Sequence, residues 1–374
     1  MVRVLHLADL HLGWEPKYLP EHKSKLIRKE RDLILQKAVD FALAPQNHIH
    51  GVLIVGDLFE RYNPEESLVR ETMRQLQRLV ANDKWCVTVP GNHDEITYYN
   101  SVYRVQGHQW PGVLVTNPMP EHCFSTVVEG TPVHVYSLAY TGGLTKANQM
   151  SGFPYIQEGG FHIGAFHGSL DWDGLADRSL PLSSASLASA KYQYIALGHY
   201  HTYMEKQVGL GKAVYPGGIG LKTVGDPGVG FFTVVQWNGA EVGIEKVPVD
   251  VRQFKKRSLD VSLLANQEEL LVEISKIANP EDLVSLTLEG NPPFQINEEL
   301  LNVVLEPLFF YVEWNNQTQF FSEAYLQALS LEQTIRGHFV RRMQEKMKVA
   351  QDPGERALVE QALLKGLQAL EGGK

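Results

Sequence analysis

Five short segments of this chain, far apart in the sequence, contain side chains of the kinds that bind metal ions. They are Asp9-Leu10-His11, Gly56-Asp57, Gly91-Asn92-His93-Asp94, His167-Gly168 and Gly198-His199-Tyr200-His201. Imidazole and oxygen donors together suit Mn²⁺, Fe or Zn²⁺, and no thiolate accompanies them to narrow the choice. Two divalent ions about 3.5–4 Å apart can hold a hydroxide and a phosphoryl oxygen for in-line displacement. The segments therefore predict a two-metal hydrolase.

Two metal ions at such a centre need one carboxylate that both of them share. Asp57 is the best candidate for this bridge, because it follows a continuous apolar run, residues 51–56, that is typical of a strand buried on both faces. The other predicted ligands divide between the ions: Asp9, His11 and His201 for one, and Asn92, His167 and His199 for the other.

His93 and Asp94 are expected to take part in catalysis without binding the metal ions. His93 adjoins a predicted ligand and should face the phosphate, so we expect it to be the general acid that protonates the leaving oxygen. Asp94 is expected to hydrogen-bond His93 and to fix its tautomer. Two more histidines, His134 and His162, fall inside strand-like runs and could support the ligands.

The elements that must position these residues are visible as periodic patterns. Strand-like runs end at the first three segments, and helical patterns with apolar residues at helical spacing lie between them. The strands are expected at residues 2–8, 51–56 and 85–89, and the helices at residues 25–43 and 66–80. This alternation predicts parallel strands with right-handed crossovers, whose carboxyl ends meet at one edge of a sheet.

Further along the chain the pattern changes, and this change sets the expected fold and domains. Short strand-like runs with little helix between most of them predict a second sheet packed on the first. The fold class is therefore α/β, a four-layer α/β/β/α sandwich followed by a small α+β capping domain and C-terminal helices. The expected bounds are 1–250 for the catalytic domain, 251–320 for the cap and 321–374 for the helical segment.

Composition excludes several other classes of protein. The net charge is −9, so any contact with nucleic acid must come from local basic patches or bound metal. The two cysteines, Cys86 and Cys123, cannot form a disulfide framework or a thiolate metal site, which favours a reducing cytoplasm. The N-terminus has no signal-peptide pattern and no apolar stretch is long enough to span a membrane, so a membrane protein is not expected.

Taken together and in order, the five segments resemble the signature of the calcineurin-like metallophosphoesterases, within the first 220 residues. Residues 7–13, 55–59 and 89–94, and later residues 194–201 and 215–218, look like the SbcD-type DNA exonucleases of double-strand-break repair. The resemblance implies Mn²⁺-dependent cleavage of DNA, a cap that guides the DNA, and C-terminal helices that dock on an SbcC-type coiled-coil ATPase. A YhaO-like side branch of the same family stays open, as does a homodimer.

The chain departs from that branch at two positions. Glu60 stands where these nucleases often carry His or Asp, and Gly218 replaces the usual serine of a Pro-Gly-Ser. Two other functions remain as alternatives: a small-molecule phosphodiesterase or phosphoprotein phosphatase with the same chemistry, and a non-catalytic scaffold on the same fold. The segment of about 120 residues after the catalytic domain argues against a minimal phosphatase.

Candidate contacts with DNA and with a partner lie outside the five segments. Aromatic residues after the motifs could stack on bases, although packing is their commoner role: Trp14, Tyr18, Tyr98, Tyr99 and Tyr103. A basic cluster precedes the expected cap: Arg252, Lys255, Lys256 and Arg257. Amphipathic helical patterns at residues 335–347 and 355–370 are the expected docking module for the ATPase, with core packing as the plainer explanation.

Overall fold

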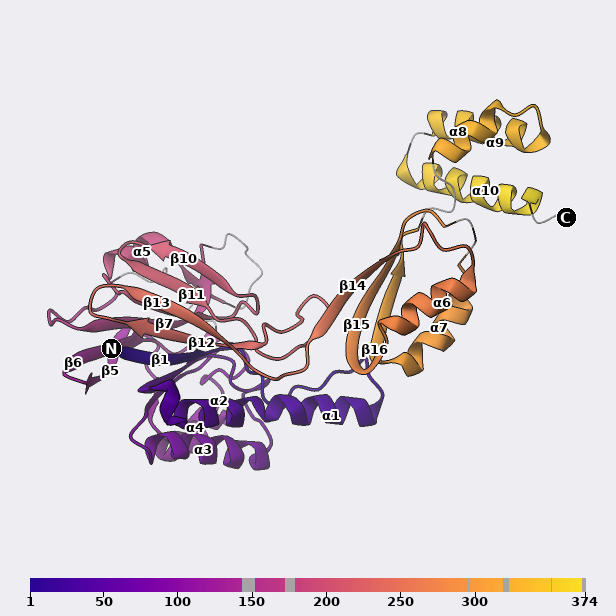
Figure 1. The fold of residues 1–374 in the computed structure, drawn as a ribbon. Helices are drawn as coiled ribbons and strands as arrows, with labels where there is room; N and C mark the ends of the chain where they lie inside the picture. Colours follow the sequence, from indigo (N-terminus) through magenta and orange to yellow (C-terminus); the bar gives the residue numbers. More distant parts are fainter. Residues whose placement is uncertain are drawn as a thin grey trace. The chain divides into compact units, whose positions relative to one another are not determined.

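The chain divides into two compact units, residues 1–254 and residues 255–374, in a computed structural model (Figure 1). The structure describes residues 1–142, 152–171, 179–292, 294, 296–318, 323–350 and 352–371. In this described part, no helix has the length and apolar composition needed to cross a bilayer.

The first unit contains a six-stranded sheet in the order β13-β12-β1-β2-β3-β4. Strands β1 to β4 are parallel, and β12 and β13 add to the β1 edge in antiparallel fashion. The strands are β1 Val2–Leu7, β2 Gly51–Val55, β3 Trp85–Val89, β4 Val113–Leu114, β12 Phe231–Trp237 and β13 Val242–Pro248. The connecting helices are α1 Glu21–Asp32, α2 Ile34–Leu43, α3 Glu66–Val80 and α4 Val102–Gln106, with 3-10 turns at Pro45–Asn47 and Gly107–Gln109.

The single helix expected over residues 25–43 is wrong, because the chain forms two helices that meet at Leu33. The end of α1 is fixed by two side chains that reach back to the loop after β1. Arg31 is buried and donates a hydrogen bond to the carbonyl of Leu10 at 3.0 Å, and Asp32 accepts one from the amide of Gly13 at 2.6 Å. These contacts hold the end of α1 against the loop that carries the first predicted ligands.

A second, seven-stranded sheet runs in the order β10-β11-β9-β7-β6-β5, with β8 paired to β7. Its central strands β6, β7, β9 and β11 are parallel. The elements are β5 Glu121–Val128, β6 Thr131–Ser137, β7 Phe161–Leu170, β8 Leu180–Leu182, α5 Ser184–Ser189, β9 Tyr194–Gly198, β10 Met204–Val208 and β11 Gly211–Tyr215.

The two sheets share one hydrophobic core. Val52 and Val87 of the first sheet belong to the same buried cluster as Val135 and Ile163 of the second, and residues of α2 and α3 complete it on the far side. A separate cluster under α5 covers the outer face of the second sheet. Helices α1 to α4 and helix α5 thus lie on opposite sides of the paired sheets (Figure 1), and the expected α/β/β/α fold is confirmed.

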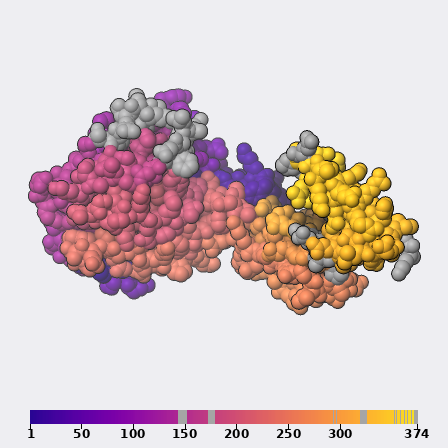
Figure 2. Space-filling view, turned by 90° about the horizontal axis from the view of Figure 1, so that it is seen from above, coloured from indigo at the N-terminus to yellow at the C-terminus, as the bar shows by residue number. Residues whose placement is uncertain are grey.

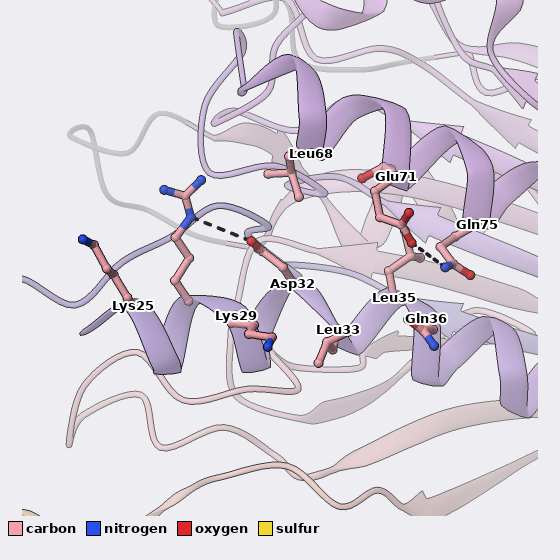
Figure 3. Close-up of a pocket in the computed structure, with 11 residues that line it drawn as sticks. Lys25, Lys29, Asp32, Leu33, Leu35, Gln36, Leu68, Glu71 and Gln75 are labelled. Atoms are coloured by element: carbon pink, nitrogen blue, oxygen red, sulfur yellow. Dashed lines mark hydrogen bonds and ion pairs between the residues drawn. The ribbon is translucent and has the colours of Figure 1, made fainter. Parts of the chain in front are cut away.

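A groove of about 420 Å³ lies where the first helices pack together (Figure 3). Lys25 and Lys29 of α1 line one side, and Leu68 and Gln75 of α3 line the other. Gln75 is buried and donates a hydrogen bond to Glu71 at 2.6 Å. Apolar side chains, among them Leu35 and Leu68, and charged ones thus line the same groove.

The second unit contains a small α+β region and a three-helix region. Strands β14 Phe254–Asp260, β15 Asn279–Glu289 and β16 Phe309–Asn316 form a sheet, on which α6 Gln267–Lys276 and α7 Glu298–Leu305 pack through one cluster, with a 3-10 turn at Glu306–Leu308. Asn266 and Asn297 cap the two helices by accepting hydrogen bonds from backbone amides. Helices α8 Glu323–Leu331, α9 Ile335–Val349 and α10 Pro353–Glu371 have their own small core and are yellow in Figure 2.

Candidate metal centre

The five segments meet at the carboxyl ends of strands from both sheets. β1 leads to Asp9 and β2 to Asp57, and the two loops are tied together because the amide of His11 donates to the carbonyl of Asp57 at 2.9 Å. In the second sheet, His167 of β7 pairs in register with Gly198, the last residue of β9. The fold therefore delivers every predicted ligand to one edge, as parallel strands do.

The backbone is strained where it delivers these ligands. Asp9, His11 and Asp57 have φ values of 54°, 48° and 50°, in the left-handed region that non-glycine residues seldom occupy. Gly56 has a φ of 81°, and a Cβ there would lie 2.0 Å from Nδ1 of His167. Such strain persists only where surrounding contacts hold it, and it is concentrated at functional sites.

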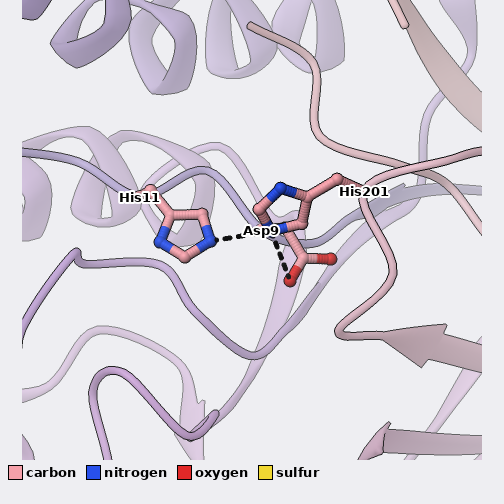
Figure 4. A group of neighbouring side chains, drawn as sticks. All are labelled: Asp9, His11 and His201. Atoms are coloured by element: carbon pink, nitrogen blue, oxygen red, sulfur yellow. Dashed lines mark hydrogen bonds and ion pairs between the residues drawn. The ribbon is translucent and has the colours of Figure 1, made fainter. Parts of the chain in front are cut away.

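Asp9, His11 and His201 form the first group of donors (Figure 4). The Nε2 atoms of His11 and His201 are 3.0 Å apart, and Nε2 of His201 lies 3.9 Å from Oδ1 of Asp9. Asp9 also accepts the backbone amide of His199 on both carboxylate oxygens, at 3.1 and 3.0 Å. This second contact fixes the carboxylate so that it faces the two imidazoles.

Asn92, His167 and His199 form a second group beside the first. Oδ1 of Asn92 lies 3.0 Å from Nε2 of His167 and 2.9 Å from Nδ1 of His199. Asp57 stands between the groups, because its Oδ2 is 3.7 Å from Nε2 of His11 and 3.5 Å from Nε2 of His167. A carboxylate that bridges two ions needs this intermediate position.

The outer nitrogens of three rings are held by acceptors. Nδ1 of His11 lies 2.8 Å from a carboxylate oxygen of Glu60, Nδ1 of His167 lies 2.9 Å from the carbonyl of Val55, and Nδ1 of His201 contacts the carboxylate of Asp226. When Nδ1 donates its proton outward, the lone pair of Nε2 faces the centre, which is the usual arrangement behind metal-bound histidine.

The donor set fits divalent metal ions. With both Nδ1 atoms facing carboxylates, the Nε2 atoms of His11 and His201 face each other at 3.0 Å, and a cation between them would satisfy both lone pairs. Two donors bound at about 2.1 Å to one ion lie about 3.0 Å apart at a right angle and about 3.4 Å apart at the tetrahedral angle. The observed donor separations, 2.9 to 3.9 Å, extend from just below that range to about 0.5 Å above it.

Burial and charge move the pKa values of the site in opposite directions. Burial alone would raise the pKa of Asp57, but the histidines around it, His167 first, hold it well below its usual range. Burial lowers the pKa of His167, but the Asp57 carboxylate, together with Asp9 and the carbonyl of Val55, more than offsets this and raises the pKa to about 9. Without metal, Asp57 and His167 are therefore a buried ion pair, and a bound cation would take the place of the proton on His167.

His93 lies at the exposed side of the same centre. Its ring packs edge-on against His11 with centroids 4.7 Å apart, and its Nδ1 lies 3.1 Å from the carbonyl of Glu60. Its backbone amide donates to Oδ1 of Asp57 at 2.9 Å. His93, His11 and Asp57 also have ligand atoms within 4.8 Å of one another. The side chain of His93 is 38% exposed, whereas that of His11 is 1% exposed, so His93 is the more accessible to a substrate.

The expected hydrogen bond between Asp94 and His93 is wrong. The buried carboxylate of Asp94 instead accepts the amides of Gly91 at 2.7 Å and Phe59 at 3.1 Å and the hydroxyl of Tyr103 at 2.7 Å. Asp94 therefore fixes the loop that carries Asn92 and His93 and does not set the tautomer of His93. Burial, together with the nearby Asp57 carboxylate, raises its pKa to about 6.

Other residues have roles that the sequence did not reveal. Glu60 and Asp226 contact the outer nitrogens of His11 and His201, and Lys222 lies 3.2 Å from Glu60. Glu60 follows Asp57 by three residues, so its nearness to that motif was the available signal; no local pattern marks Asp226 or Lys222. His134 and His162 pair with each other in β6 and β7 and contact no predicted ligand among the described residues.

Comparisons with known proteins agree with this chemistry. The chain is 25% identical over 311 residues to the uncharacterized metallophosphoesterase YhaO of Bacillus subtilis, covering 77% of this chain and 72% of YhaO. It is 24% identical over 309 residues to the DNA double-strand break repair protein Mre11 of Methanosarcina acetivorans, covering 78% of this chain but 46% of that Mre11. The chain thus spans less than half the length of that relative.

A solved structure is similar only at a low level. Wild-type Vps29 of Entamoeba histolytica, complexed with Zn²⁺, is 17% identical, covers 66% of this chain and 99% of its own, and has a TM-score of 0.32. The family comparison is firmer, because residues 2–206 match the Calcineurin-like phosphoesterase family and include every predicted ligand. The chain therefore belongs to the calcineurin-like phosphoesterase family.

Proposed function

We propose that this protein is a metal-dependent DNA nuclease of the SbcD type that hydrolyses phosphodiester bonds with two divalent metal ions. The observation that carries the reaction type is the position of Asp57 between two groups of donors, within 3.7 Å of His11 and 3.5 Å of His167. The choice of DNA is supported by the similarity to Mre11, which extends over 78% of the chain and so beyond the phosphoesterase segment.

Two bound divalent ions would activate water and neutralise charge on the phosphoryl oxygens. The chain supplies the rest of the proposed mechanism. Asp57, Asp9, Asn92 and the histidines would hold the ions, and Glu60 and Asp226 contact the outer nitrogens of His11 and His201 and so orient these rings. The carbonyl of Glu60 faces Nδ1 of His93, which leaves Nε2 of His93 as the nitrogen that donates a proton to the departing sugar oxygen.

The proposed function also includes a metal ion and a protein partner. We take Mn²⁺ as the working metal, with Fe and Zn²⁺ as the alternatives that the nitrogen and oxygen donors accept. We also propose that helices α8 to α10 dock on an SbcC-type coiled-coil ATPase. Support comes from apolar side chains left exposed on these helices and their ends: Leu331, Ile335, Val349 and Leu358.

A substrate panel tests the proposed function. Purified protein with Mn²⁺ would be given linear DNA, a cyclic nucleotide, a phosphopeptide and bis(p-nitrophenyl) phosphate, with an Asp57→Asn variant as the matched inactive control. We expect cleavage of DNA that is lost in the variant. High turnover of the cyclic nucleotide or the phosphopeptide with inactivity on DNA would instead assign the chain to the small phosphodiesterases or the protein phosphatases.

A further inference from the structure

A pocket of about 730 Å³ lies beside the metal centre in the first unit. One wall is the loop that continues from His11, residues 12–19, and the opposite wall is the loop that follows Asp57, residues 60–65. Glu60 connects the pocket to the metal centre, because it lines the pocket and its carboxylate lies 2.8 Å from Nδ1 of His11. We call this space the Trp14 pocket after the largest side chain that lines it.

The size and lining of the Trp14 pocket suit a small aromatic group with polar edges. Pockets for small ligands commonly measure about 300–1,000 Å³ and combine apolar walls with a few polar groups. Trp14, Tyr18 and Leu68 supply aromatic and apolar surface here, and Asn63 supplies an amide. Arg31 does not line the pocket, but its buried guanidinium packs over the ring of Trp14, with Cζ 4.8 Å from the ring centre.

The charges around the Trp14 pocket favour a phosphate-bearing ligand. All four acidic side chains of its wall have a cationic partner: Glu60 with Lys222 at 3.2 Å, Glu21 with Lys25 at 2.5 Å, and both Glu65 and Glu15 with Arg28, at 2.7 and 3.8 Å. Lys17 and Arg61 are exposed and have no ion-pair partner in the described part of the chain. Two cationic side chains without an ion-pair partner therefore remain at the pocket, although the whole chain carries −9.

We propose that the Trp14 pocket receives the base of a nucleotide turned out of its stack next to the phosphate that the metal centre cleaves. The base lies against Trp14, and Lys17 and Arg61 contact the flanking phosphates. Enzymes that must expose one nucleotide commonly hold its base between aromatic side chains, and stacking of this kind tolerates every base. The proposal rests on the nuclease function above and narrows its substrate to unpaired or fraying strands.

The experiment uses full-length protein with Mn²⁺ and single-stranded oligonucleotides. One substrate carries natural bases only, and each of the others carries one abasic residue at one of the last three nucleotides of the 5′ or 3′ end. The variants are Trp14→Ala and Trp14→Phe, together with Lys17→Gln and Arg61→Gln. Lys191→Gln is the matched control. Lys191 is also exposed and has no ion-pair partner among the described residues, but it precedes β9, at the opposite end of that strand from the metal centre. Thermal unfolding of each variant checks that it is folded.

We expect wild-type protein to cleave natural ends about tenfold better, as kcat/KM, than ends with the abasic residue at one of these positions. Trp14→Ala should remove this preference, Trp14→Phe should keep most of it, and Lys191→Gln should not change it. Lys17→Gln and Arg61→Gln should weaken cleavage of natural and abasic ends alike.

Two results would overturn the proposal in different ways. Equal cleavage of natural and abasic ends by wild-type protein, or an unchanged preference in folded Trp14→Ala, would show that no base enters the pocket while leaving the nuclease function intact. Hydrolysis of bis(p-nitrophenyl) phosphate without cleavage of any oligonucleotide would remove the nuclease function, and the base pocket with it.

Discussion

Two clusters of histidines lie in the same unit, and their surroundings differ. At the metal centre the rings of His11, His167 and His201 each have an acceptor behind Nδ1, and two aspartates stand among them. On the second sheet, His134 and His162 stack with centroids 4.8 Å apart, and among the described residues neither ring nitrogen of His134 makes a hydrogen bond. One exposed carboxylate, that of Glu158, lies 3.7 Å from Nε2 of His134. Histidines alone therefore do not make a metal site.

The difference lies in what fixes the direction of each lone pair. At the metal centre the outer acceptors aim Nε2 inward, and the carboxylates add the negative charge that a divalent cation requires. In the second cluster, His162 uses its nitrogens on the hydroxyl of Tyr136 and the carbonyl of Glu158, so they already have partners in the protein. Burial lowers the pKa of His162, which keeps that ring neutral near pH 7.

The largest effect should come from removing the shared carboxylate. Asp57→Asn should lower the hydrolysis rate by about a thousandfold or more, because metal-ion polarisation contributes several kcal/mol to such reactions. The variant should also bind fewer than two metal ions per chain, as measured by elemental analysis. His162→Gln is the control from the second cluster and should keep both metal content and rate. Full metal content in Asp57→Asn would refute the bridging role.

A smaller loss of rate should follow from changing His93 without touching the ligands. His93→Asn should slow cleavage by about a hundredfold to ten-thousandfold, the usual contribution of a general acid, while two metal ions stay bound. The loss should be less for bis(p-nitrophenyl) phosphate, because its leaving group needs little protonation. If metal content falls instead, His93 is a ligand, as its nearness to His11 and Asp57 would allow.

The sequence predicted those ligands of the metal centre that directly follow a recognisable strand. Asp9 and Asp57 each follow a strand-like run, so their place at one sheet edge could be inferred from periodicity. The role of Asp226 could not be predicted from the sequence. Asp226 lies 25 residues after His201, and the two side chains meet only because the intervening chain folds back to the site. The predicted contact of Asp94 with His93 is wrong because neighbours in the sequence need not have side chains that point toward each other. The carboxylate of Asp94 instead accepts a hydrogen bond from the amide of Gly91.

Removing a carboxylate that contacts an outer ring nitrogen should weaken metal binding measurably, but by less than removing a ligand. Glu60→Gln and Asp226→Asn should each weaken metal binding about 10–100-fold, because these carboxylates orient the rings of His11 and His201 and strengthen them as ligands. Asp171→Asn is the control, since Asp171 is a carboxylate paired with Lys206 and contacts no predicted ligand among the described residues. Titration with Mn²⁺ would measure the affinities. Unchanged affinity in both variants would show that ring orientation needs no carboxylate.

The smallest effect concerns a histidine that is buried without any carboxylate. His6 bonds the hydroxyl of Tyr194 at 2.8 Å, and burial lowers its pKa from 6.5 to about 3. Between these values the unfolded chain binds a proton that the folded chain does not, so stability is full above pH 6.5 and falls as pH decreases. This contribution is at most about 1.4 kcal/mol per pH unit.

Denaturant unfolding of the metal-free protein between pH 7 and pH 5 measures this contribution. The free energy of unfolding should fall less steeply with decreasing pH in His6→Gln than in the wild-type protein, whatever stability the substitution itself removes. The opposite sign applies to His167, whose pKa is raised to about 9, so its contribution is present below pH 6.5 and is lost as pH rises through 9. Identical slopes for wild type and His6→Gln would mean that His6 takes up a proton in the folded state, and burial alone would then not keep a histidine neutral in this fold.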